Sequence, residues 1–238
     1  MGQIFTVIFY QPVLNVLVFF YNILPGHDLG LVIVALTVAI KLFLWPLSQR
    51  ALRSQQAISR LQPKIKELQK KYKDNREEQG KALMELYRQE KVNPASSCLP
   101  LLIQLPFLWA VFRVFRDGLS NKSLTLVYPF ISRPELLETV SFGIIDLAKP
   151  NAFLAIMTGV VQYFQAKTAT RQMPAAASGE GSRTEELTAI MNKQMLYVMP
   201  VVTIAICWTL PSGLALYWFL SSGLTIAQQV YWFRKNSN

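Results

Sequence analysis

A run of nineteen residues, 29–47 (LGLVIVALTVAIKLFLWPL), constrains this chain more than any other stretch. The run is apolar except for Thr37 and one charged residue, Lys41. As a helix it would rise about 28 Å, which is close to the thickness of the hydrocarbon core of a bilayer. We therefore predict that 29–47 is a membrane-spanning helix around which the rest of the chain is arranged.

Lys41 falls well inside that predicted span, about 9 Å from Leu47 along the helix axis. A charge at such a depth costs about 2.5–3.5 kcal/mol on insertion scales, so it needs water, a partner or a function. We interpret Lys41 as a functional cation. The alternative is that its flexible stem only carries the ammonium group to the nearer, Leu47 end of the span.

The distribution of charge is typical of a membrane protein. The chain is 52% hydrophobic and has a formal net charge of +10. Twelve of its 24 Lys and Arg residues fall between Arg50 and Lys91, and four fall between Lys167 and Lys193. Because basic loops that alternate along the chain follow the positive-inside rule for cytoplasmic segments, the basicity needs no nucleic acid, and DNA is not an expected partner.

Apolar segments of suitable length recur down the chain. We predict an all-α membrane protein, one domain over 1–238, in which five transmembrane helices alternate in direction and leave the C-terminus in the cytoplasm. The predicted spans are 29–47, 98–116, 151–167, 195–210 and 213–233. The loop after the second span is expected outside, with an interfacial piece around 141–147. The Ala-, Ser- and Gly-rich segment 171–192 is expected to be a flexible cytoplasmic linker.

The first apolar segment, 4–24, allows two interpretations. Its length would let it cross the bilayer. Gln11, Asn15 and Asn22, however, fall within about 40° of one another around a helix, and such a polar stripe is typical of an amphipathic helix lying in the interface. The residues before His27 include no Lys or Arg, so charge does not decide between the two.

A polar segment, 48–93, separates the first two predicted spans. Its apolar residues, among them Ile58 and Ile65, recur at helical spacing. Asp74 and Asn75 are a natural turn and cap, and a bend is expected at Pro63. We predict a cytoplasmic helical hairpin. Its excess of basic residues would give it a weakly specific attraction to anionic lipid headgroups or to ribosomal RNA.

The sequence lacks the residue patterns of common catalytic and metal sites. It contains one histidine, His27, and none of the predicted spans contains Asp or Glu. Phosphate-binding loops, zinc-protease motifs and nucleophile elbows do not occur in it. We therefore expect no catalytic residue, no cofactor and no metal, and a protein that is not an enzyme.

Polar residues are scattered through several predicted spans and together suggest a hydrophilic groove within the membrane. The groove candidates are Lys41, Thr37, Gln104, Gln162, Ser221 and Ser222. Each uncharged candidate taken alone is better explained by helix packing, and an amide such as that of Gln104 would also serve as a hydrogen bond between helices. The groove is therefore a hypothesis about the set.

Four stretches resemble the YidC family of membrane protein insertases, which has relatives in mitochondria and plastids. They are TVAIKLFLWPLS at 37–48, LQPKI at 61–65, EKVNPASSCLPLLIQLPF at 90–107 and LPSGLALYW at 210–218. The resemblance extends over nearly the whole chain and is closest to the short bacterial form. It implies a five-helix core around a groove that opens to the cytoplasm and to lipid and is closed outside. It also implies that 4–24 is an amphipathic helix on the outer surface.

By this resemblance the chain would insert nascent hydrophobic segments into a bacterial cell (inner) membrane without hydrolysing nucleotide. Lys41 stands where the family has an Arg, which preserves a point charge but not a planar guanidinium. The hairpin would receive the nascent chain, and Tyr217 and Trp218 would contact the emerging span, although packing between helices explains these two equally well. Nascent membrane proteins and the lipid bilayer are the implied partners, and a role for the ribosome or the Sec translocon stays open.

Two other classes of function also stay open. A small transporter would use Lys41 as an anion site, but it would need broken helices or an inverted repeat, and the sequence shows neither. A structural assembly partner would instead pair Lys41 with an acidic residue of another subunit.

Overall fold

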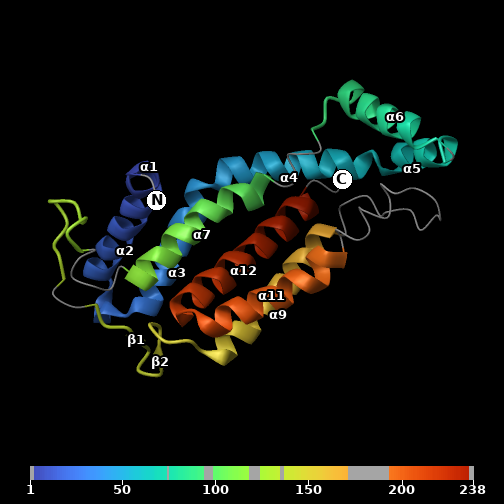
Figure 1. Ribbon diagram of the computed structural model, residues 1–238. Helices are drawn as coiled ribbons and strands as arrows, with labels where there is room; N and C mark the ends of the chain where they lie inside the picture. Colours follow the sequence, from blue (N-terminus) through green and yellow to red (C-terminus); the bar gives the residue numbers. More distant parts are fainter. Residues whose placement is uncertain are drawn as a thin grey trace. The chain divides into compact units, whose positions relative to one another are not determined.

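The computed structural model in Figure 1 describes residues 3–73, 75–93, 99–117, 124–134, 137–170 and 193–235. These residues are mostly helical, in agreement with the predicted all-α class, and they include one short β-hairpin. The chain divides into two compact units. The first unit consists of Met1–Leu44, Leu101–Gln162 and Val201–Leu224, and the second of Trp45–Pro100, Tyr163–Pro200 and Thr225–Asn238.

The first unit begins with a continuous helical segment. It is made of α1 (Gln3–Phe5), the π-helical turn η1 (Thr6–Tyr10) and α2 (Gln11–Ile23). One face of α2 is buried in the core of the unit, where Leu14, Leu17 and Val18 are fully covered. The opposite face of the segment 3–23 exposes apolar side chains, among them Ile8 of η1 and Phe19 and Ile23 of α2.

The polar stripe of α2 binds the loop at residues 124–134. Gln11 and Asn15 donate side-chain hydrogen bonds to the carbonyl oxygen of Leu126, at 3.1 and 3.2 Å, and the Asn15 oxygen accepts the backbone N–H of Tyr128 at 2.7 Å. Asn22 donates to the carbonyl oxygen of Ser132 at 2.7 Å. The polar side chains of the stripe therefore form hydrogen bonds with backbone groups of the loop. The stripe alone is then no longer a reason to place 4–24 in the membrane interface.

The predicted span 29–47 is not one unbroken helix. After the 3-10 turn η2 (Pro25–His27), α3 runs over Leu29–Phe43 and α4 begins at Trp45. The break at Leu44 lies two residues before Pro46, which has no N–H to donate to the carbonyl group of Leu42 and whose ring clashes with that carbonyl group in a continuous helix. At ~1.5 Å per residue, the fifteen residues of α3 rise roughly 22 Å.

Four further helices and one β-hairpin contribute to the first unit. The helices are α7 (Leu99–Asp117), α9 (Ala152–Thr170), α11 (Met199–Thr209), which follows the π-helical turn η4 (Gln194–Val198), and α12 (Ser212–Lys235). The strands β1 (Val140–Ser141) and β2 (Ile145–Asp146) pair antiparallel.

The hairpin joins the starts of three helices. Ser141 bonds to Asp28, which caps α3, and the N–H groups of Ser212 and Gly213, at the start of α12, donate to the carbonyl oxygens of Lys149 and Leu147. The chain then enters α9 at once, and the ring of Phe115, near the end of α7, lies against Gly213. At this end of the first unit, α3, α9 and α12 therefore begin and α7 ends.

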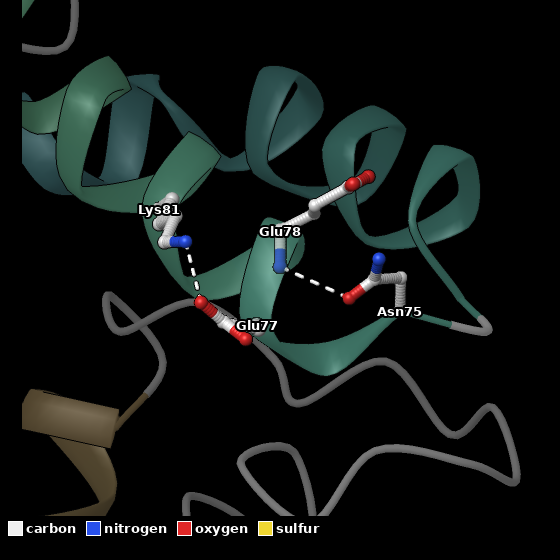
Figure 2. Close-up of polar contacts among 4 residues, drawn as sticks. All are labelled: Asn75, Glu77, Glu78 and Lys81. Carbon is white, nitrogen blue, oxygen red and sulfur yellow. Dashed lines mark hydrogen bonds and ion pairs between the residues drawn. The ribbon is translucent and has the colours of Figure 1, made fainter.

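The second unit contains the helices of the predicted hairpin 48–93. They are α4 (Trp45–Arg60), α5 (Gln62–Lys71) and α6 (Arg76–Gln89). Ile58, Leu61 and Ile65 are buried, and the chain breaks between α4 and α5 just before Pro63. Figure 2 shows the start of α6, where the Asn75 side-chain oxygen accepts the N–H of Glu78 and Lys81 pairs with Glu77. Asp74, the other predicted turn residue, lies outside the described residues.

Length and hydropathy identify few membrane spans among the described residues. One helical segment, Gln3–Ile23, is long and apolar enough to cross a bilayer, and a second candidate arises if α3 and α4 are taken together as one bent span. The segment Gln194–Thr209 is apolar but shorter. The five-span topology, the interfacial position of 4–24, the single domain over 1–238 and the cytoplasmic hairpin stay predictions, and the linker 171–192 lies outside the described residues.

Candidate functional site

Lys41 lies in the last turn of α3 and is the only charged residue of that helix. Its side chain is partly buried, whereas the preceding Ile40 is covered by the core and the following Leu42 and Phe43 are exposed. The free carbonyl groups at the end of a helix favour a nearby positive charge. This position is closer to a helix terminus than the sequence predicted, because α3 stops at Phe43 and not at Leu47.

Thr37 lies one helical turn before Lys41 and is buried. Its hydroxyl donates to the carbonyl oxygen of Ile33 at 2.6 Å, a bond within α3 itself. A threonine bonded in this way keeps its remaining acceptor capacity for a second group. Thr37 and Lys41 therefore lie on one side of α3, and the Thr37 hydroxyl donates to the backbone of the same helix.

Three candidates from distant parts of the sequence form a hydrogen-bonded cluster between α7 and α12. The side-chain amide of Gln104 donates to the Tyr217 hydroxyl at 2.7 Å, and Ser221 also hydrogen-bonds to that hydroxyl. Tyr217 is 1% exposed, so its polar end is satisfied entirely by protein groups. A contact between Tyr217 and a substrate would therefore require this side chain to be uncovered.

The remaining candidates are found on α9 and α12. Ser222 is buried beside Ser221, and Trp218 is partly buried and packs against the core of the first unit. Gln162 has its side-chain oxygen buried, and among the described residues that oxygen has no hydrogen-bond partner. An unpaired buried polar atom costs about 1–3 kcal/mol, so buried groups of this kind are usually paired, often with ordered water.

Sequence reasoning missed Asp28 as a structural anchor. Its carboxylate accepts the N–H of Leu31 at 3.1 Å, the hydroxyl of Ser141 at 2.7 Å and the N–H of Phe142 at 2.5 Å. Burial acts to raise the pKa of this carboxyl, but the hydrogen bonds from Phe142, Ser141, Leu31 and Gly30 together hold the pKa below its ordinary value. An Asp directly before a long apolar run is a helix-capping signal, and this signal was available in the sequence.

The described part of the chain offers little for a metal ion. No group of three or more His, Cys, Asp and Glu side chains converges there.

Comparison with known proteins gives a consistent result. Residues 19–238 match the family model described as 60Kd inner membrane protein. The chain is 32% identical over 225 residues to the membrane protein insertase YidC of Endomicrobium trichonymphae, covering 94% of this chain and 39% of that protein. It is also 32% identical over 229 residues to the membrane protein insertase YidC of Syntrophobacter fumaroxidans, covering 95% of this chain and 38% of the relative. The chain thus spans about two fifths of the length of these relatives.

Proposed function

This chain belongs to the 60Kd inner membrane protein (YidC) family, and we propose that it is a membrane protein insertase. It would move hydrophobic segments of newly made proteins into the bilayer through a polar groove that carries Lys41, without nucleotide hydrolysis. The observation that carries the proposal is that Lys41, the one charged residue of α3, lies partly buried in the last turn of that helix. The names of the relatives support the proposed activity, and the positions of the chain's own residues support the proposed site.

The proposed topology has five spans, α3, α7, α9, α11 and α12, with 4–24 as an outer interfacial helix. The hydrogen bonds that join the starts of α3 and α12 to the β-hairpin support an alternating arrangement, since α9 also begins there and α7 ends there. In this arrangement the β-hairpin lies outside. The helices α4, α5 and α6 lie in the cytoplasm, where they would receive the nascent chain. The exposed apolar face of the segment 3–23 would contact lipid.

The thermodynamics of insertion explain why no nucleotide is needed. A substrate segment of ~20 apolar residues gains several kcal/mol by entering the bilayer, at about 0.3–0.6 kcal/mol per Leu, Ile, Phe or Val. The obstacle is kinetic, because the polar flank of the segment must cross the hydrocarbon core. A hydrated groove shortens the dry part of that path.

Lys41 would act on the flank during this crossing. A positive charge beside a region of low dielectric attracts an acidic or polar flank more strongly than it does in water. Uncharged hydrogen-bonding groups would come from Gln104, Gln162, Ser221 and Ser222. The buried side-chain oxygen of Gln162 supports a hydrated environment, because a buried acceptor of this kind is usually bonded to water when no protein group is near. Trp218 would offer ring surface to the emerging span, and Tyr217 would do so once its buried side chain is uncovered.

The proposal is tested by reconstituting the purified chain in protein-free liposomes without nucleotide. A substrate with one span and an acidic flank is added, and its insertion is measured by protection from protease. Lys41→Arg should retain insertion, because the point charge is kept. Lys41→Ala and Lys41→Glu should lower the initial rate by about tenfold or more, the effect of losing at least ~1.4 kcal/mol of barrier reduction.

Lys149→Ala is the matched control, since it removes one positive charge from an exposed position in the β-hairpin loop. It should insert at the wild-type rate. Equal rates for all Lys41 variants would remove the electrostatic role. Insertion no faster than in empty liposomes, together with uptake of a small anion, would favour a transporter.

A further inference from the structure

The turn that joins β1 to β2 presents exposed apolar side chains on a strained backbone. Ile144 donates its N–H to the carbonyl oxygen of Ser141, and the two residues between them have positive φ, 51° for Phe142 and 67° for Gly143. Asn-Gly is the usual pair in such a turn, and a bulky residue at positive φ costs of order 1 kcal/mol or more. Phe142 is nevertheless 66% exposed and Ile144 is 83% exposed.

The base of the hairpin, by contrast, is firmly held. On one side Asp28 accepts hydrogen bonds from the Ser141 hydroxyl and the Phe142 N–H. On the other side the hydroxyl of Ser212 donates to the carbonyl oxygen of Asp146 at 3.1 Å, and the backbone of α12 adds two further bonds to the same loop. Both oxygen atoms of the Asp28 side chain accept hydrogen bonds here, which is the role of an ionised carboxylate. The turn is thus fixed in place although its apolar side chains are uncovered.

The surroundings of the turn indicate what covers it. α3 exposes Leu31, Val34, Val38 and Leu42 at helical spacing, and α9 exposes Phe153, Ile156 and Val160 in the same way. In a protein of a membrane family such stripes are the surfaces that lipid contacts. The hairpin is bonded to the residue that caps α3, and its second strand leads directly into α9, so the apolar turn stands at the end where both stripes begin.

We propose that Phe142 and Ile144 insert into the bilayer at the boundary between headgroups and acyl chains, next to the start of α3, with Asp28 holding the turn at that depth. The proposal rests on the membrane topology given above. Behind the turn, the exposed Lys149 forms an ion pair at 3.0 Å with the partly exposed Asp146, and this pair would remain in water. A polar base and an apolar tip are the features of a segment that lies at an interface.

The test measures depth with spin labels in lipid nanodiscs, using the full chain with Cys98 and Cys207 replaced by Ser. One label is attached at Ile144→Cys and the control label at Lys149→Cys, in the same loop. We expect the label at 144 to collide more often with oxygen, which concentrates in the bilayer, and the label at 149 to collide more often with a water-soluble nickel chelate. Equal nickel collision at both positions would overturn the proposal, because the turn would then be in water.

Spin–spin broadening at 144 with shielding from both reagents would also overturn it, in favour of contact with a second copy of the chain. The part played by Asp28 is tested by Asp28→Asn, which keeps one acceptor oxygen but turns an NH₂ group toward the Phe142 N–H. We expect greater mobility at 144 and loss of the difference from 149, and unchanged spectra would contradict this role. No substrate is present, so failure here is distinct from failure of insertion.

Discussion

At the scale of single residues, Lys41 is the side chain whose position most needs explanation. The end of a helix stabilises a nearby cation by about 0.3–1 kcal/mol, whereas a charge within the bilayer costs about 2.5–3.5 kcal/mol. In the proposed topology, the position of Lys41 in the last turn of α3 therefore offsets only part of this cost. The remainder must come from water or polar groups around the ammonium, which is what the proposed groove supplies.

Gly213 illustrates how tightly the start of α12 packs. A Cβ atom at this position would lie 2.6 Å from Cε1 and 2.8 Å from Cδ1 of Phe115, closer than such atoms approach in proteins. We expect Gly213→Ala to lower the free energy of unfolding by about 1–3 kcal/mol, because the ring must shift within a packed core. Denaturant unfolding in detergent micelles measures the change.

Gly223→Ala is the matched control, because it lies on the same helix and a Cβ atom there would meet nothing within 4 Å. It should leave the free energy of unfolding unchanged or raise it by up to ~1 kcal/mol through helix propensity. Trimming the ring in the double variant Gly213→Ala, Phe115→Leu should recover part of the loss. Indistinguishable unfolding of the two single glycine variants would show that the close packing has no energetic effect.

At the scale of elements, the contact between α2 and the loop 124–134 depends on Asn15. This buried side chain both donates to the Leu126 carbonyl and accepts the Tyr128 N–H. Asn15→Ala would leave that N–H without its acceptor, so we expect a loss of about 1–3 kcal/mol in the free energy of unfolding. Faster hydrogen exchange of the Tyr128 amide should accompany the loss.

Asn22→Ala serves as the comparison, since its bond to Ser132 is exposed. Its effect should stay within about 0.5 kcal/mol, as for most surface substitutions. If the two asparagine variants had equal stability and the Tyr128 amide exchanged at its wild-type rate in both, the loop would not be held by this contact.

At the scale of the whole molecule, the parts that could be predicted from sequence are those that depend on neighbouring residues. Helical periodicity predicted buried positions such as Ile58 and Ile65, and the cap at Asn75 was visible as a local signal. The end of α3 differs from the predicted Leu47 because the apolar content was weighed above the effect of Pro46, which removes one hydrogen bond of a continuous helix.

Contacts between distant residues could not be predicted in the same way. The sequence identified Gln104 and Tyr217 as candidates, but they are 113 positions apart and nothing in the local pattern says that they bond to each other. The polar stripe of α2 was visible, yet its acceptor, the Leu126 carbonyl, is a backbone group that any residue would supply. Local periodicity shows that a helix has a polar stripe, but it does not show which group the stripe binds.

The central claim is that the end of α3 carrying Lys41 lies in a hydrated groove, and water access at this position tests it most directly. Lys41→Cys and Val38→Cys are compared in sealed proteoliposomes of the Cys-free chain, because Val38 belongs to the exposed apolar stripe of α3. A charged maleimide that does not cross membranes reacts only with thiols in contact with water. The account predicts that position 41 is modified while position 38 is protected, and protection of both positions would contradict it.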